Sequence, residues 1–298
     1  MNLIVGLGQV FWEYYFPNIN KKTYDFLDII PTKLPSSLTC MNNIAEVSKD
    51  NYKCIYVLTP PDTHSEIINK LYTKTESFYI EKPTFKSLEE FEKAKLVVKN
   101  VSLLGGHSRR FFNNYIEFKK ILLNWMNQSR IVKINISEGA LYKWSPKSIE
   151  SILDDELSHL IDSVLYILNY TEKTINQNII KVSGDNITNL HIEFAIDDIP
   201  VVIDYSRNSD LIDQIEIVFE NNTSLHLNTK LNGDIHSYIN NILLQVKTKY
   251  KKQSSVSVFN EIITHINSNS FIHDDSYKLT KFYNTLSIID KIKEEPLK

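Results

Sequence analysis

The stretch Leu3-Ile4-Val5-Gly6-Leu7-Gly8 decides the fold that this sequence predicts. A short apolar run that ends at a glycine is typical of a buried parallel strand, and residues 9–20 have the mixed aromatic and polar spacing of a short helix. In such a strand–turn–helix unit, two glycines allow a pyrophosphate to approach the helix N-terminus closely. The third small residue of this pattern is replaced by Phe11, so an ordinary strand-to-helix turn remains the alternative.

An acidic residue follows the glycines at the distance expected of a ribose ligand. Asp28 lies near the end of the second predicted strand, residues 24–30, about 20 residues after the glycine turn. A carboxylate there would accept a hydrogen bond from the ribose 2′-hydroxyl and favour NAD over NADP. The alternative is a turn aspartate in a strand that ends at Ile30. The predicted cofactor contacts in this part of the chain are Gly6, Gly8, Gln9, Val10 and Asp28.

Alternating strands and helices predict a doubly wound parallel sheet in the first part of the chain. After residue 106 the pattern changes to β-rich stretches separated by turn signals, which indicate a mostly antiparallel sheet. We therefore expect an α/β protein with an N-terminal Rossmann domain, residues 1–106, and a C-terminal α/β domain with a large open sheet, residues 107–298. The last helix is a candidate to pack back on the first domain. The apolar runs are 54–58, 77–80 and 101–104. The β-rich stretches are 179–183, 190–195, 200–205 and 214–219. Helices are expected over 64–74, 88–100, 112–127, 155–169, 236–249, 255–268 and 274–293.

Composition excludes several classes of function. The 298 residues carry a formal net charge of -3, and no block of lysine and arginine suggests a nucleic-acid partner. No run reaches the roughly 18 apolar residues of a membrane span, and the chain enters a strand at once rather than a signal peptide. The two cysteines, Cys40 and Cys54, provide neither a disulfide framework nor a zinc site by themselves. We expect a cytoplasmic protein without a metal.

Two predicted strand ends carry the side chains of a ligand crevice. Thr59, Pro60 and Pro61 stop the run 54–58 and are followed by His64, and Glu81-Lys82-Pro83 ends the next strand. In open α/β sheets the carboxyl ends of the strands line the crevice. There the Lys82 ammonium could donate a hydrogen bond to a substrate hydroxyl and assist its deprotonation. Taken alone, the first segment is equally a strand terminator and the second a surface lysine before a turn.

An acid and an imidazole lie one turn apart at the start of the predicted helix 155–169. Asp155 and His159 share one face of that helix, where the acid could orient the ring and stabilise its protonated form. The alternative is that the acidic residues interact favourably with the dipole at the helix N-terminus, while His159 is a hydrogen-bonded histidine of the core. Asp162, one turn further on, is assigned a structural role.

Taken together, these segments resemble the Gfo/Idh/MocA oxidoreductase family, which includes inositol dehydrogenase and glucose–fructose oxidoreductase. The similar segments are the glycine turn, Thr59-Pro60-Pro61-x-x-His64, Glu81-Lys82-Pro83, residues 106–111 and Asp155-x-x-x-His159-x-x-Asp162. The resemblance spans nearly the whole chain. It implies a Rossmann domain, a second domain whose sheet supports a homodimer or homotetramer, and hydride transfer between NAD(P) and a sugar or polyol carbon.

The resemblance also implies roles for particular residues. Lys82, Asp155 and His159 become the catalytic set, in which His159 exchanges the hydroxyl proton, Lys82 polarises the oxygen and Asp155 orients the site. The implied cofactor is NAD or NADP, with NAD favoured through Asp28. The remaining cofactor contacts are Thr59, Pro60, Pro61, His64, Glu81 and Lys82. The substrate contacts outside the catalytic set are Arg109, Tyr142 and Trp144.

Three readings of function follow. The first is an NAD(P)-dependent dehydrogenase acting on a CH–OH group of a sugar, polyol or nucleotide-sugar. The second is a non-catalytic or regulatory relative that keeps the fold. It is suggested by Phe11 and by the aromatic residues that follow it, which could crowd the adenosine side: Trp12, Tyr14, Tyr15 and Phe16. The third uses the cofactor without net redox change, as in glycoside cleavage by transient oxidation. Loops near 140–150 and 205–212 are expected to set the substrate.

Overall fold

The computed structural model describes residues 1–30, 34–98, 100–139, 151–170, 177–208, 211–240, 242–244, 250–268 and 283–297. The chain forms two compact units, and it passes between them more than once. Residues 1–108 and 254–283 make up the first unit, and residues 109–253 and 284–298 make up the second.

In the described part of the first unit, six strands form a fully parallel sheet in the order β3-β2-β1-β4-β5-β6, the doubly wound arrangement that the sequence predicts. The central strands are buried on both faces, which explains why they read as continuous apolar runs. The strands are β1 (Asn2–Val5), β2 (Tyr24–Leu27), β3 (Cys40–Met41), β4 (Ile55–Val57), β5 (Ser77–Glu81) and β6 (Ser102–Gly106).

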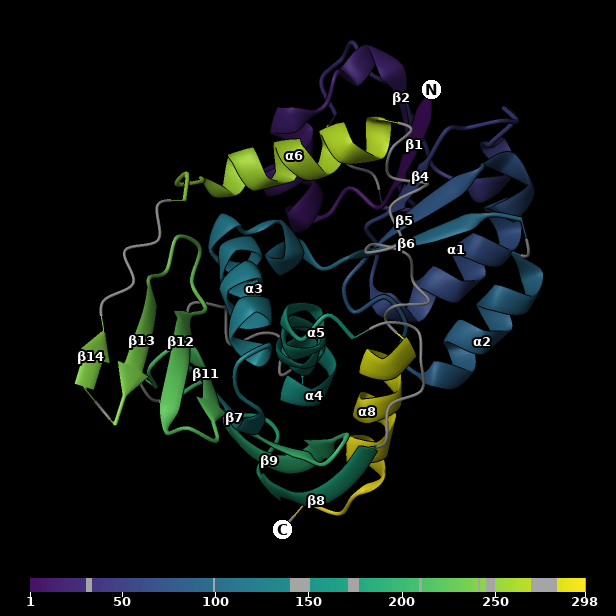
Figure 1. Cartoon of the computed structure of the whole chain (residues 1–298). Coiled ribbons are helices and arrows are strands. Elements are labelled where there is room, and N and C mark those ends of the chain that lie inside the picture. The colour runs from purple at the N-terminus through teal and green to yellow at the C-terminus, as the bar shows by residue number, and fades with distance from the viewer. Residues whose placement is uncertain are drawn as a thin grey trace. The chain divides into compact units, whose positions relative to one another are not determined.

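Helices of two kinds accompany this sheet. The helices α1 (His64–Leu71) and α2 (Leu88–Val97) pack against each other (Figure 1), and α2 begins at Ser87, whose hydroxyl accepts a hydrogen bond from the Glu90 amide. The short helix expected after the glycine turn is not an α-helix. It contains a π-helical turn, η1 (Phe11–Tyr15), which continues into a 3₁₀ turn.

A helix from late in the chain completes the first unit. The helix α6 (Ser255–Asn267) packs against η1 (Figure 1), where the Phe259 ring stacks on Tyr14 at 4.7 Å. At the end of α6, the side chain of Asn267 is hydrogen-bonded to the side chain of Asn2 at 2.8 Å and to the Tyr24 hydroxyl at 3.1 Å. The helix α6 therefore returns to the first unit after the chain has formed the sheet of the second.

In the described part of the second unit, eight strands form one open sheet in the order β14-β13-β12-β11-β7-β10-β9-β8. Of the strand pairs described in this sheet, β7–β10 alone is parallel, which confirms the predicted mostly antiparallel sheet. Alternate residues of β9 are buried and half-exposed, as expected of a sheet covered on one face. The strands are β7 (Ile131–Gly139), β8 (Gln177–Gly184), β9 (Asn189–Ile196), β10 (Ile199–Ser206), β11 (Gln214–Phe219), β12 (Thr223–Asn228), β13 (Ile235–Ile239) and β14 (Ile242–Leu244).

Among the described residues, four helices share the core of the second unit with the buried face of this sheet (Figure 1). The last helix belongs here because Ile288, Ile289 and Ile292 are buried in this core. The helix expected over residues 236–249 was wrong, since β13 and β14 cover 235–239 and 242–244. Buried Ile235 and Ser237 alternate with half-exposed neighbours, which is the period of a strand. The helices are α3 (Asn113–Met126), α4 (Ile152–Asp155), α5 (Leu157–Ile167) and α8 (Tyr283–Glu294).

Candidate active site

The glycine turn after β1 has the geometry of a close-approach turn. Gly6 has a φ of +93°, and a Cβ atom there would lie 2.7 Å from the Thr59 methyl group and 2.9 Å from the Thr59 backbone nitrogen. Any side chain at Gly6 would therefore displace the turn or the end of β4. A Cβ atom at Gly8 would meet nothing within 4 Å, so this side of the turn is open.

Asp28 follows β2 directly and lies against the same turn. One carboxylate oxygen accepts a hydrogen bond from the Leu7 amide at 2.7 Å, and the other accepts one from the Ile30 amide at 2.9 Å. The Asp28 amide in turn donates to the Met41 carbonyl at 3.0 Å. These bonds hold the carboxylate beside the glycines, which is where a ribose ligand is needed.

The aromatic residues after the turn are divided between the core and the surface. Phe11 and Tyr15 are fully buried, and the Phe11 ring meets Phe26 of β2 edge-on at 5.9 Å. Phe11 therefore fills space under the turn, toward the sheet. Trp12 and Tyr14 are only partly buried. Helix formation in the π rather than the α form is a feature that often accompanies functional sites.

His64 joins the loops that follow β4 and β5. Its Nε2 lies 2.7 Å from the Thr59 carbonyl oxygen and its Nδ1 lies 2.9 Å from the Thr84 carbonyl oxygen. Burial lowers the pKa of this imidazole, against the effect of the two carbonyl groups. Both ring nitrogens thus face backbone carbonyl groups, so His64 connects Thr59, after β4, with Thr84, after β5.

Glu81 and Lys82 end β5, at the same edge of the sheet as the glycine turn and Thr59. The Glu81 carboxylate accepts hydrogen bonds from the Tyr15 hydroxyl at 2.6 Å and from the Lys82 amide at 2.9 Å. Burial raises the pKa of this carboxyl group. The Lys82–Pro83 peptide bond is cis. Because β1, β4 and β5 are adjacent parallel strands, their carboxyl ends bring these predicted residues together.

In the second unit, Asp155 and His159 do not share one continuous helix. The helix α4 ends at Asp155, and the amides of His159 and Leu160 both bond to the Glu156 carbonyl, at 3.0 and 3.3 Å. The predicted start of a single helix at 155 was wrong because Ser151 caps a separate helix three residues earlier, through the Leu153 amide.

Asp155 has a partner that the sequence motif does not contain. Its carboxylate lies 3.3 Å from the Arg207 guanidinium, and both side chains are half-buried. Arg207 directly follows β10, in the loop near 205–212 that was expected to influence the substrate. His159 is half-buried on α5.

Two consecutive arginines enter ion pairs in the second unit. The Arg109 guanidinium donates two hydrogen bonds to the Glu138 carboxylate, at 2.8 and 2.6 Å, so its predicted contact with substrate competes with this pair. Arg110 binds Asp162 in the same bidentate way, at 2.9 and 2.5 Å. The buried pair agrees with the structural role assigned to Asp162.

The identity of the first unit follows from its sequence together with this geometry. The profile of the Gfo/Idh/MocA group, described as an oxidoreductase family with an NAD-binding Rossmann fold, matches residues 3–104. Residues 3–104 belong to the Gfo/Idh/MocA oxidoreductase family. The match covers the glycine turn, Asp28, Thr59 and Lys82 of this Gfo/Idh/MocA domain. No curated protein matches the sequence.

Solved structures extend the likeness of fold to both units. A dehydrogenase (MviM) from Clostridium difficile has 19% identity and a TM-score of 0.71, with 98% of each chain covered. A UDP-N-acetylglucosamine 3-dehydrogenase from Acidithiobacillus ferrooxidans has 12% identity and a TM-score of 0.70, covering 98% of this chain and 95% of that one. An aldose–aldose oxidoreductase from Caulobacter crescentus has 12% identity and a TM-score of 0.75, covering 98% and 96%.

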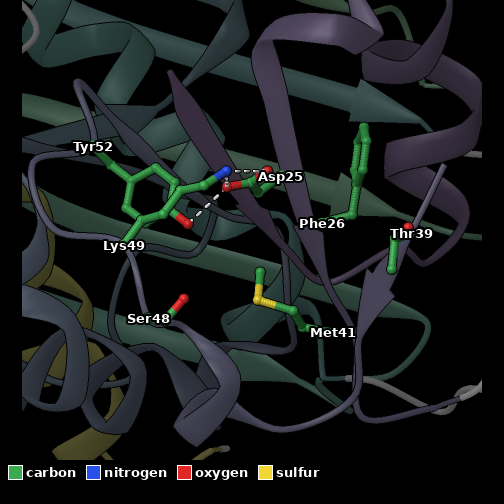
Figure 2. A pocket seen from close by; sticks show the side chains of 7 residues that line it. All are labelled: Asp25, Phe26, Thr39, Met41, Ser48, Lys49 and Tyr52. Carbon is green, nitrogen blue, oxygen red and sulfur yellow. Dashed lines mark hydrogen bonds and ion pairs between the residues drawn. The ribbon is translucent and has the colours of Figure 1, made fainter.

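A hollow in the Gfo/Idh/MocA domain is lined by residues of β2 and of segments that follow it (Figure 2). Its Asp25 carboxylate binds the Lys49 ammonium at 2.7 Å and the Tyr52 hydroxyl at 2.8 Å, so its charge is already compensated. Asp25 lies on the amino-terminal half of β2, whereas Asp28 follows the carboxyl end. We do not assign a cofactor to this hollow. Its lining residues are Asp25, Phe26, Thr39, Met41, Ser48, Lys49 and Tyr52.

The predicted catalytic residues are divided between the two units. Lys82 belongs to the first unit, whereas Asp155 and His159 belong to the second. Tyr142 and Trp144 lie outside the described residues. Among the residues that are described, no group of three His, Cys, Asp or Glu side chains is arranged to hold a metal ion, and no helix is long and apolar enough to cross a membrane.

Sequence reasoning missed several residues that the structure places beside the predicted ones. Tyr15 bonds to Glu81, Glu138 to Arg109, and Arg207 to Asp155. Tyr15 had a signal, since a tyrosine in the first helix is unusual for the family pattern and was interpreted only as a source of crowding. The two ion pairs join residues distant in sequence that no motif connects.

Proposed function

We propose that this chain is an NAD-dependent dehydrogenase that moves a hydride between the nicotinamide and a hydroxyl-bearing carbon of a sugar, polyol or nucleotide-sugar. The observation that carries the proposal is the shared edge of β1, β4 and β5, where the glycine turn, Thr59 and Lys82 meet. The family of residues 3–104 is an NAD-binding oxidoreductase family. The likeness in fold to a UDP-N-acetylglucosamine 3-dehydrogenase and an aldose–aldose oxidoreductase supports a sugar substrate.

The residues of the first unit fit a dinucleotide. The tight turn at Gly6 and the open side of Gly8 leave room for a pyrophosphate, because a Cβ atom at Gly8 would face empty space. The Asp28 carboxylate retains acceptor capacity beyond the Leu7 and Ile30 amides, since each carboxylate oxygen has two lone pairs. A ribose 2′-hydroxyl could donate to it, whereas a 2′-phosphate would be repelled, so we favour NAD over NADP.

The roles in proton transfer are those that the family resemblance implies for Lys82, His159 and Asp155. The cofactor, when bound, accepts or donates the hydride. The Lys82 ammonium donates a hydrogen bond to the substrate oxygen and stabilises negative charge that develops there. His159 takes the hydroxyl proton during oxidation and returns it during reduction. Asp155, held by Arg207, orients the polar groups of the second unit.

Kinetics of a lysine variant test this assignment. With NAD and a panel of sugars, polyols and nucleotide-sugars, Lys82→Ala should lower kcat by about 100-fold or more, because general acid–base groups contribute about 10²–10⁴-fold. Lys86→Ala, which removes an exposed lysine four residues further on, should leave kcat within twofold. Equal sugar oxidation by Lys82→Ala and the wild type would contradict the mechanism.

Cofactor binding distinguishes the remaining readings of function. Titration with NADH, followed by nicotinamide fluorescence, should show saturable binding that Lys82→Ala largely retains. A lack of binding at millimolar NADH would favour a non-catalytic relative. Cleavage of a glycoside without net NADH would instead indicate transient oxidation.

We also propose that the sheet of the second unit supports a homodimer or homotetramer. Helices cover one face of this sheet, whereas outward residues of β9 to β12 remain only partly buried. Light scattering at micromolar concentration should give at least twice the mass of one chain, 34.7 kDa. A monomer under these conditions would contradict this part of the proposal.

A further inference from the structure

Two buried tyrosines form a hydrogen-bonded network with Glu81. The Tyr15 hydroxyl donates to one carboxylate oxygen at 2.6 Å and is hydrogen-bonded to the Tyr79 hydroxyl at 3.0 Å. Both tyrosine side chains are completely buried. Tyr79 and Glu81 are two residues apart on β5 and so share one face of the strand, toward which η1 brings Tyr15.

The second oxygen of Glu81 carries this network to Lys82. It accepts a hydrogen bond from the Lys82 amide at 2.9 Å, so the carboxylate is bound at both oxygens. Gly106 of β6 lies so close that a Cβ atom there would be 3.0 Å from the Glu81 Cα. The end of β5 that carries Lys82 is therefore packed closely against Gly106 of β6, and the Glu81 carboxylate holds the Lys82 amide by a hydrogen bond.

Aromatic packing fixes the Tyr15 ring itself. Edge-on contacts join it to Phe259 of α6 at 5.2 Å, to Tyr79 at 6.1 Å and to Tyr56 of β4 at 6.3 Å. Such contacts stabilise a ring beyond the effect of its burial. Because these contacts involve only the ring, removal of the hydroxyl group should leave the ring in place.

We propose that Tyr15 is a positioning residue of the dehydrogenase, which acts through Glu81 to hold the Lys82 backbone and to keep a negative charge beside the Lys82 ammonium. The inference rests on the proposed role of Lys82. It also gives a function to the aromatic first helix, which the sequence alone connects only with crowding of the cofactor.

The charge of Glu81 depends on the groups that face it. Burial raises the pKa of Glu81, whereas the Tyr15 hydroxyl, the Lys82 amide and the Lys82 charge lower it. Glu81 in turn raises the pKa of Tyr15 and of Tyr79, which burial already raises strongly, so both phenols remain protonated donors. Loss of the Tyr15 hydroxyl should therefore shift the carboxyl group toward its protonated form, in which it can no longer stabilise the Lys82 ammonium.

The Tyr15→Phe variant tests the proposal by two independent measurements. In protein labelled with ¹³C at glutamate carboxyl groups, the Glu81 titration should move to higher pH in Tyr15→Phe, without any substrate being present. In turnover assays kcat should fall about tenfold, as expected for a hydrogen bond to a charged group, and the acid limb of the kcat–pH profile should move upward in the same direction. The KM for NAD should remain within twofold.

Three further variants exclude a merely structural effect. Tyr14→Phe removes a phenol of the same helix outside the Glu81 network and should behave as the wild type. In a Glu81→Gln background, Tyr15→Phe should change kcat by less than twofold, because the group through which Tyr15 acts is already altered. Tyr79→Phe should shift the Glu81 titration in the same direction by a smaller amount, and it serves if Tyr15→Phe does not fold.

The possible results separate this inference from the proposed function. An unchanged Glu81 titration and unchanged kcat in both Tyr15→Phe and Tyr79→Phe would overturn the inference while leaving the dehydrogenase in place. Equal losses from Tyr15→Phe in the wild-type and Glu81→Gln backgrounds would overturn it as well. A shifted Glu81 titration in a protein that oxidises no sugar would support the coupling of Tyr15 to Glu81 and contradict the proposed function.

Discussion

Replacing Asp162 by asparagine should destabilise the second unit strongly. The Arg110 and Asp162 side chains are only 5% and 1% exposed, and two hydrogen bonds of 2.9 and 2.5 Å join them. Asp162→Asn nearly preserves volume but leaves the Arg110 charge buried without its carboxylate. Breaking a buried ion pair in this way costs about 3–5 kcal/mol. At roughly 2–4 °C per kcal/mol, Tm should fall by roughly 6–20 °C.

Urea unfolding followed by circular dichroism and tryptophan fluorescence measures this loss. Trp125 reports on the second unit, since its ring packs at 5.5 Å from Phe219. The double variant Arg110→Met/Asp162→Leu should recover most of the free energy of unfolding, because apolar side chains remove the buried charges altogether. As a control, Glu66→Gln in the exposed pair with Lys70 should cost less than about 1 kcal/mol.

Two results would refute the reasoning about Asp162. If Asp162→Asn lowered the free energy of unfolding by less than about 1 kcal/mol, the Arg110 charge would have to reach water in the variant. Losses in that range are typical of solvent-exposed ion pairs. A double variant as unstable as Asp162→Asn alone would mean that the lost stability comes from packing rather than from an uncompensated charge.

Four other substitutions give contrasting expectations. Gly6→Ala should lower Tm and weaken NADH binding at least tenfold in fluorescence titrations, because the new Cβ collides with the loop after β4. Gly8→Ala should weaken NADH binding with Tm nearly unchanged, because its Cβ meets no protein atom and enters the space left for the pyrophosphate. Wild-type NADH binding by Gly8→Ala, or an unchanged Tm of Gly6→Ala, would refute the close-approach argument. The hydrogen bond to Asp204, and a second to a neighbouring glutamate, raise the pKa of His191, so the stability it contributes is fully present below pH of about 6.5 and is lost as pH rises through the raised value. His191→Gln should therefore lower Tm more at pH 6 than at pH 9. The loss of unfolding free energy should stay below about 1 kcal/mol, because the side chain is partly exposed. A larger loss of Tm at pH 9 would contradict the predicted direction of the pH dependence. Ser87→Ala removes the N-cap of α2 and should cost about 1 kcal/mol in thermal unfolding, while no loss would mean that the cap is replaced by water.

Much of the fold could be predicted from local patterns. The buried parallel strands read as apolar runs because both of their faces are covered, as in Ile55–Val57. The helix predicted over 236–249 failed because Ile235–Ile239 is short and its alternation covers few residues, so the two periods are hard to distinguish. At the break between α4 and α5, the His159 amide donates to the Glu156 carbonyl. The sequence pattern does not indicate which carbonyl this amide bonds to.

The candidate site was predictable where one segment carries the chemistry and not where two segments meet. Gly6 and Asp28 follow from a strand–turn–helix unit of fixed size, and the structure joins them through the Leu7 amide. The partners of Tyr15 and Arg109 lie 66 and 29 residues away, on other elements. Such pairs are set by tertiary packing, for which a single sequence gives no spacing rule.

The hydrogen bond between Asn2 and Asn267 has a consequence for the order in which the protein can be made. The strands of the first unit are complete once residue 106 has been synthesised, but α6 follows roughly 160 residues later. At about 5–20 residues per second, a ribosome needs roughly 8–32 s for that interval. During this time η1 lacks its contact with Phe259, so the Tyr14 and Tyr15 rings lack the partner that packs against them in the finished unit. The first unit therefore begins folding first and finishes late, and a nascent chain arrested before residue 254 should expose this helix to proteases.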